Sequence, residues 1–176
     1  MRDDPDAHRE VVQPIGPTDR HLGSRVAAAR ASRRLSQRTL GRWIARSHTV
    51  IGRWEAGTLE PTLFDLADLA RAFRVTIEVL VGDAAAAPIG RRRSSRRSGL
   101  RRRRAVGSEL RAARHHAGLA PIDVWRRCGI SPTRVVSIES GAEPSMSELV
   151  ALRELLGLDL DQLVTRARAG CRSAQR

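Results

Sequence analysis

Arginine side chains dominate the binding chemistry available to this sequence. The 176 residues include 32 Lys or Arg, every one of them Arg, and the net charge at pH 7 is +13. A planar guanidinium suits paired hydrogen bonds to a phosphate or to the edge of a guanine better than a lysine ammonium does. Codon bias in a GC-rich genome would also favour Arg over Lys, but it does not explain the excess of positive charge. An anionic partner is therefore the first expectation.

The residue types that catalyse reactions or hold metals do not occur at useful spacings. The sequence has no paired carboxylates, no nucleophile–base set, no metal-ligand cluster and no glycine-rich phosphate loop. His115 and His116 are neighbours, so they lie about 100° apart on a helix and not on one face as an i, i+4 metal pair. Cys128 and Cys171 form neither a disulfide framework nor a metal motif, and Cys128 has the position of a core residue. We expect no catalytic residues, no metal and no cofactor.

The sequence repeats itself at a spacing of 84 residues. Residues 36–57 read SQRTLGRWIARSHTVIGRWEAG and residues 120–141 read APIDVWRRCGISPTRVVSIESG, with apolar or small residues at matching places. The match continues upstream and, with one residue deleted, downstream, over about 60 residues in all. A repeat of that length indicates two copies of one small domain and not one large fold.

Helix-capping residues divide each copy into short helices. In the first copy, Ser36 and Ser47 each precede a helix, Gly57 follows one, and Thr62 with Asp65 forms a capping pattern. We expect five helices, which start near residues 23, 36, 47, 62 and 76. The second copy carries corresponding signals at Pro121, Ser131, Ser145 and Asp159. Because no alternating strand pattern occurs, the sequence predicts an all-α fold.

Charge and composition mark the expected boundaries along the chain. The expected parts are a disordered N-terminal arm at 1–20, a first domain at 21–83, an Arg-rich flexible linker at 84–104, a second domain at 105–165 and a basic tail at 166–176. The linker holds nine Arg, and like charges at that density extend a chain. The net charge is +5 over 21–82 but −2 over 105–165, so the two copies are unequal.

Membrane and export signals are not apparent in the sequence. No apolar run approaches the roughly 18–20 residues of a membrane span. The N-terminus is acidic and rich in proline, with no apolar signal core. We expect no membrane association and a cytoplasmic location.

Residues 35–57, LSQRTLGRWIARSHTVIGRWEAG, carry the most specific pattern. This segment resembles the helix-turn-helix of the phage-repressor/Cro-like (XRE) family in its Leu-Ser-Gln start, its Ser-capped second helix and its Glu-x-Gly ending. The resemblance covers residues 22–82 closely and 106–164 more loosely. It implies two tandem five-helix, lambda-repressor-like helix-turn-helix domains. It further implies a sequence-specific DNA-binding transcriptional regulator of bacterial or phage type, with double-stranded DNA as partner and a nucleoid-associated location.

The resemblance places a recognition helix at about residues 47–56, in the major groove of DNA. The residues that it implies for base reading are His48, Thr49 and Arg53, and Arg53 could form a bidentate contact to guanine. The residues assigned to phosphate binding are Gln37, Ser36, Ser47, Arg30 and Arg46. Arg38 and Arg42 either add phosphate contacts or form a solvated face. Glu55 resembles the family's structural glutamate, which ties helices together.

The first copy departs from the family pattern in the turn before the recognition helix. Arg46 occupies a position that is usually apolar, and Ala45 replaces the turn glycine. Because alanine tolerates a positive φ poorly, we expect a strained or reshaped turn. Trp43 and Trp54 are expected in the core or at its edge.

The second copy departs further from the pattern. Pro121 replaces the phosphate-binding Gln, and Pro132, Thr133 and Ser137 replace the three base-reading residues. Trp125 stands where the family has Ala or Gly, so we expect a changed angle between the two helices.

Two roles therefore remain open for residues 105–165. The domain either reads DNA, with Thr133, Arg134 and Ser137 as candidate contacts, or mediates self-association or binding of a protein partner. The second role would suit an antitoxin-like or adaptor protein. The Arg run either adds non-specific DNA affinity or is a solvated linker.

Overall fold

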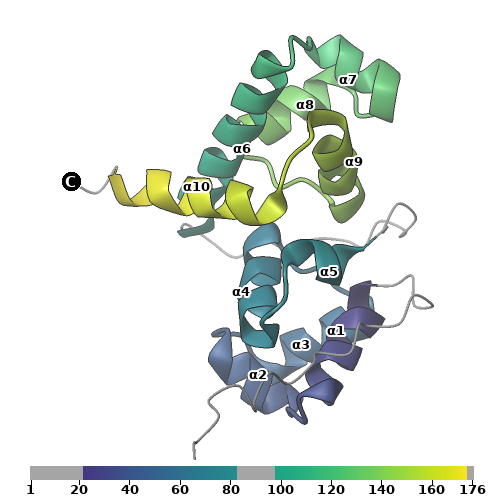
Figure 1. Ribbon diagram of the computed structural model, residues 1–176, viewed down its shortest axis with the longest axis vertical. Coiled ribbons are helices and arrows are strands. Elements are labelled where there is room, and N and C mark those ends of the chain that lie inside the picture. Colours follow the sequence, from purple (N-terminus) through teal and green to yellow (C-terminus); the bar gives the residue numbers. More distant parts are fainter. Residues whose placement is uncertain (1–21, 83–97, 174–176) are drawn as a thin grey trace, which may run out of the picture.

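The computed structural model describes residues 22–82 and 98–173, and the elements of these two ranges are all helices. Figure 1 shows them as two groups of five that follow each other along the long axis of the molecule. The first group comprises α1 (Leu22–Ser32), α2 (Gln37–Trp43), α3 (His48–Glu55), α4 (Leu63–Phe73) and α5 (Ile77–Val81). The second comprises α6 (Ser98–His116), α7 (Pro121–Cys128), α8 (Pro132–Glu139), α9 (Met146–Leu156) and α10 (Leu160–Ser173). The prediction of an all-α protein with two five-helix domains in tandem is confirmed.

The capping residues set the starts of the helices as the sequence predicts. The hydroxyls of Ser36 and Ser47 accept hydrogen bonds from backbone N–H groups in the first turns of α2 and α3. Thr62 and Asp65 form a reciprocal capping box at the start of α4. These bonds satisfy N–H groups that have no partner inside the helix. None of the described helices is long and apolar enough to cross a membrane.

Four equivalent positions, one on each of the first four helices of a domain, are buried in both copies. They are Val26, Leu40, Ile51 and Leu66 in the first domain and Leu110, Val124, Val135 and Leu149 in the second. Burying such a side chain stabilises a fold by about 1.5–3 kcal/mol. The sequence repeat therefore corresponds to two hydrophobic cores built from equivalent residues.

Glycine brings the first and third helices of each domain into close contact. A Cβ added to Gly23 on α1 would lie 2.4 Å from the backbone oxygen of Trp54 on α3. A Cβ on Gly107 of α6 would lie 2.5 Å from the backbone oxygens of Ile138 and Glu139 on α8. Any larger residue at these places would push α3 away from α1, or α8 away from α6.

The structure corrects the boundaries of the linker and of the tail. α6 begins at Ser98, inside the expected flexible linker 84–104, and α10 runs to Ser173, inside the expected basic tail. The two helices pack against each other, and Val106 and Ala167 are buried. This burial and the hydration of the arginines offset the repulsion along the helix. The rest of the linker and the arm 1–20 lie outside the described residues.

The tryptophans and Cys128 differ in their burial. Trp54 is 2% exposed, as expected, but Trp43 is 59% exposed, so its placement at the core was wrong. Leu40 and Ile44, one turn apart on the same face, fill the core position near the end of α2 and leave Trp43 outside. Cys128 is partly buried and packs against the core, where its thiol donates to the carbonyl of Val124.

Candidate nucleic-acid interface

α3 buries one side and exposes the other because its apolar residues recur at helical spacing. Ile51 and Trp54 face the core. His48, Thr49 and Arg53 are exposed, and within the described residues none of these side chains has a hydrogen-bonding or ionic partner. We call these three residues the α3 face. The structure brings together all three residues that were predicted to read bases and leaves their polar groups available.

The helix starts beside this face present further polar groups. The Ser36 and Ser47 hydroxyls are exposed while they accept hydrogen bonds from Thr39 N–H at 3.0 Å and Val50 N–H at 3.3 Å. A serine hydroxyl that accepts still has its own hydrogen to donate. Ser47 can therefore cap a helix and donate to a phosphate at once. The Ser36 hydroxyl also lies 2.9 Å from the Thr39 hydroxyl, and its hydrogen is available to a phosphate when Thr39 is the donor of that bond.

The turn between α2 and α3 is tight. Arg46 N–H donates to the Gly41 carbonyl at 2.8 Å, and a Cβ on Gly41 would come within 2.4 Å of the Arg46 oxygen. Ala45 adopts the left-handed conformation with φ 53°, where Gly129 in the second copy has φ 75°. The turn keeps its left-handed residue despite the missing glycine, so alanine carries the strain that the sequence predicts.

An ion pair beneath the α3 face ties three helices together. Arg30 of α1 donates from Nε and Nη2 to the two carboxylate oxygens of Glu55 at 2.6 and 3.0 Å, and from Nη1 to the Leu35 carbonyl at 2.8 Å. Gln37 of α2 donates to the same carboxylate at 2.8 Å. Each nitrogen of Arg30 therefore makes a hydrogen bond inside the fold, so its guanidinium has a structural role beside the one predicted at a phosphate. Glu55 has the structural role that the resemblance implied.

The second domain repeats this ion pair. Arg114 donates to Glu139 at 2.6 and 2.9 Å and to the Leu119 carbonyl at 2.7 Å. Each of the three residues lies 84 positions after its counterpart. Pro121 replaces Gln37 and has no side-chain donor, so the third contact is missing from the second copy. Recurrence of both the Arg and the Glu in the repeat is the signal from which the pair could have been predicted.

Comparison with known families agrees with this geometry. A family model described as a helix-turn-helix domain matches the chain twice, over residues 21–81 and 105–167. The chain belongs to the helix-turn-helix domain family. Two matches, which together cover more than half of the chain, are consistent with tandem helix-turn-helix domains of the XRE/Cro type. No curated protein and no solved structure gave a significant match. A helix-turn-helix domain suggests a DNA-binding regulator.

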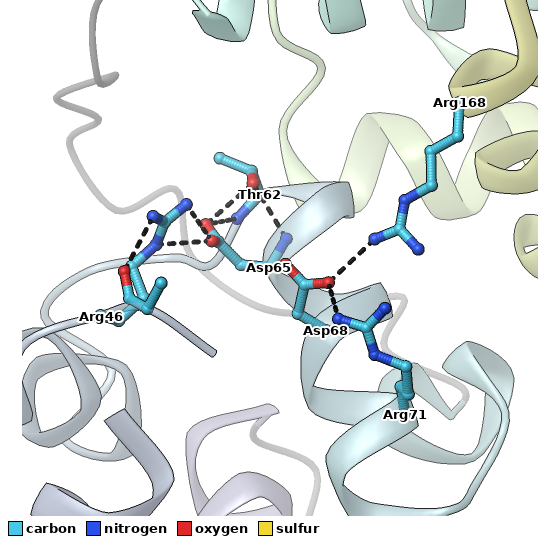
Figure 2. A network of polar contacts seen from close by, with 7 residues as sticks. Arg46, Thr62, Asp65, Asp68, Arg71 and Arg168 are labelled. Carbon is cyan, nitrogen blue, oxygen red and sulfur yellow. Dashed lines mark hydrogen bonds and ion pairs between the residues drawn. The ribbon is translucent and has the colours of Figure 1, made fainter. Parts of the chain in front are cut away.

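Arg46 of the first helix-turn-helix domain is held by an acid of α4. Its Nε and Nη2 lie 2.8 and 2.6 Å from Oδ1 of Asp65, as Figure 2 shows. Asp65 is 5% exposed and also completes the capping box with Thr62. A carboxylate buried to that extent needs a charged partner. Arg46, which was predicted to bind a phosphate, therefore also anchors the start of α4.

The second helix-turn-helix domain uses Arg134 in the same way. Arg134 donates to both carboxylate oxygens of Glu148 at 2.6 and 2.7 Å and to the Glu143 carbonyl at 2.8 Å. Arg134 therefore has a structural role in the described fold beside the DNA contact predicted for it. Thr133 and Ser137, the other two residues of the predicted set, are exposed on α8.

The second helix-turn-helix domain also exposes apolar side chains at positions where the first domain has Arg38, Gly41 and Gly52. Ile122 and Trp125 of α7 and Val136 of α8 are 39%, 51% and 52% exposed. A hollow of about 620 Å³ lies between Val136, Leu119, Pro121 and Arg111.

Proposed function

We propose that the protein is a sequence-specific DNA-binding transcriptional regulator of bacterial or phage type. The observation that carries the proposal is the α3 face, whose polar groups have no partner among the described residues and whose helix is fixed by the pair of Arg30 and Glu55. α3 would lie in the major groove, which is wide enough for a helix.

Each exposed group has a distinct role in this proposal. Arg53 pairs with O6 and N7 of a guanine, and His48 and Thr49 contact neighbouring base edges. Ser36 and Ser47 donate to backbone phosphates on either side of the major groove. Gln37, the residue after Ser36, is the third residue proposed to contact a phosphate. The net charge of +5 over residues 21–82 supplies attraction that does not depend on sequence.

The test is competition binding of the full chain to genomic DNA fragments against random DNA at moderate salt. We expect enrichment of a subset of fragments. Arg53→Ala should weaken binding to an enriched fragment by about tenfold or more, since a bidentate base contact is worth about 1–3 kcal/mol. Binding of this variant to random DNA should change far less.

Arg166→Ala is the matched control because it removes the same charge from an exposed position on α10. It should weaken binding to enriched and random DNA equally. If the intact chain shows no preference for any fragment, the proposed function is wrong.

A second candidate function is docking of a protein partner on the second domain. The observation that favours it is the exposed apolar group of Ile122, Trp125 and Val136. This function corresponds to the antitoxin-like or adaptor type. A stoichiometric partner of the full chain should be lost with Trp125→Gln and retained with Trp43→Gln, which removes an equally exposed indole from the first domain. Retention of the partner by both variants would exclude this surface.

A further inference from the structure

The two domains meet through the first turns of α5 and α10. The backbone N–H of Ile77, the first residue of α5, donates to the Asp161 carboxylate of α10 at 2.9 Å. The backbone N–H of Leu160, the first residue of α10, donates to the Glu78 carboxylate of α5 at 2.9 Å. The side chains of Ile77 and Leu160 are fully buried. Each helix therefore caps the other across the domain boundary.

These two hydrogen bonds are equivalent by the repeat. With the one-residue deletion, Ile77 corresponds to Leu160 and Glu78 corresponds to Asp161. The first residue of the last helix in each domain therefore donates to the second residue of the last helix in the other domain, and both contacts are present. This exchange is the mark of an isologous interface, in which a two-fold axis relates the partners. Copies placed head to tail would instead use two different surfaces.

The arrangement of the helices agrees with an approximate two-fold axis. In Figure 1, α1 and α5 lie on the right of the lower domain, while their counterparts α6 and α10 lie on the left of the upper domain. α2 lies at the bottom and its counterpart α7 at the top. A half-turn about the viewing direction exchanges these pairs.

Further contacts at the junction come from side chains of the second copy and, within the described residues, are not returned by the equivalent residues of the first. The guanidinium groups of Arg102 on α6 and Arg168 on α10 lie 5.4 and 5.9 Å from the ring centre of Phe64 on α4. Arg168 also donates to Asp68 at 2.9 Å, as Figure 2 shows. Both arginines belong to the helical extensions of α6 and α10 beyond the expected domain boundaries. These extensions therefore position the domains as well as lengthening the helices.

We infer that one chain is the single-chain equivalent of a two-fold helix-turn-helix dimer, and that it binds an inverted pair of unequal half-sites on one DNA duplex. This inference rests on the proposed function of α3. The two-fold relation orients α8 oppositely to α3 along the DNA. α3 specifies its half-site through Arg53 and His48, whereas α8 offers only Thr133 and Ser137 and specifies the other half-site weakly.

In vitro selection of DNA sites with the intact chain tests the inference. We expect an inverted repeat with one strongly and one weakly specified half-site, bound by one chain as measured by native mass spectrometry. Reversing the weak half-site, so that the site becomes a direct repeat, should weaken binding by about tenfold. This change is made in the DNA, so it does not depend on the folding of a variant.

A protein variant tests the junction itself. Glu78→Ala removes the carboxylate that caps α10 without placing a cation beside Asp159 and Asp161, and it should reduce the effect of reversing the weak half-site. Affinity for the strong half-site alone should stay within about twofold of the wild type, which shows that the first domain is folded. Glu154→Ala makes the same change at a position that is 60% exposed and should behave as the wild type.

The outcomes separate the two proposals. A selected direct repeat, a single half-site, two chains on each site, or separate duplexes bridged by one chain would each overturn the single-chain dimer while leaving sequence-specific binding intact. No enrichment of any sequence would overturn both proposals.

Discussion

The role of an arginine in this protein depends on whether a carboxylate lies within reach. Arg30, Arg46, Arg114 and Arg134 each approach an acid at 2.6 Å. Hydrogen bonds to the glutamates, against the opposing effect of burial, raise the pKa of Arg30 and Arg114 above the ordinary arginine value. Arg53 has no such partner within the described residues and stays exposed. The residue type alone therefore does not separate DNA contacts from structural pairs.

Ala45 gives a prediction at the scale of one residue. A non-glycine residue in the left-handed conformation costs about 1 kcal/mol, so Ala45→Gly should stabilise the first domain. In thermal unfolding, a gain of that size raises the Tm of a small domain by about 4–8 °C.

Gly129→Ala is the complementary variant because a Cβ there meets no atom within 4 Å and adds only the left-handed strain. It should lower the stability of the second domain by a similar amount. Stabilisation by both variants, or by neither, would contradict a steric origin of the effect.

At the scale of helices, the distance between α1 and α3 depends on Gly23. Gly23→Ala places a methyl group against the backbone of α3 and should destabilise the first domain by about 2 kcal/mol. Gly52→Ala is the control, since its nearest neighbour is the movable amide of Gln37 at 3.3 Å and alanine favours a helix. Chemical denaturation measures both variants, and equal losses would argue against a rigid contact at Gly23.

The pair of Arg134 and Glu148 makes the anchoring of α8 to α9 depend on pH. Burial alone would raise the pKa of Glu148, but hydrogen bonds from Arg134 and Ser145 outweigh it and hold the pKa below its ordinary value. Such a group adds stability that is present above its unfolded pKa, and this stability is lost as the pH falls through the lower folded pKa.

Glu148→Gln should therefore reduce the difference in unfolding free energy between about pH 7 and about pH 3. Urea denaturation at both values measures it. Glu154→Gln, at an exposed position on the same helix, should leave the difference as in the wild type. An unchanged pH dependence in Glu148→Gln would show that the pair does not contribute.

The sequence predicted interactions between residues that are close along the chain, but not those between residues that are far apart along it. Caps at Ser36, Ser47 and Thr62 act within one turn, so the sequence predicted where the helices start. The partners of Arg30 and Arg46 lie 25 and 19 residues away, and only the folded core brings them together. The α3 face was predictable because its residues share one short helix.

At the scale of the whole molecule, positive charge is concentrated in the Arg-rich segment that leads into α6 and includes its first turns. The linker expected at 84–104 overlaps α6, so a deletion there would remove part of a helix. Five Arg of the sequence lie between 91 and 97, outside the described residues. Replacing them by Gln should reduce the slope of log affinity against log salt by about 0.9 for each phosphate that these arginines neutralise.

This prediction is checked by titration with random DNA at several salt concentrations. The relative preference for a selected site should hardly change, because phosphate contacts carry no direct sequence information. A large loss of preference with an unchanged slope would assign base reading to this segment.

The relation between the domains could not be predicted from composition. Glu78 and Asp161 look like ordinary acids at helix starts, where acids are common in any helix. The first turns that they cap belong to the other domain, more than 80 residues away along the chain. Only the folded chain shows that equivalent residues exchange contacts.

The reciprocal junction between α5 and α10 has a consequence for direction along DNA. Two identical subunits on a palindrome have no preferred direction, because exchanging them changes nothing. In the proposed single-chain dimer the joined halves differ, and the stringent half is always N-terminal. On a site with unequal halves, the protein would therefore point one way, so that any partner docked on Trp125 would always stand on the same side of the site.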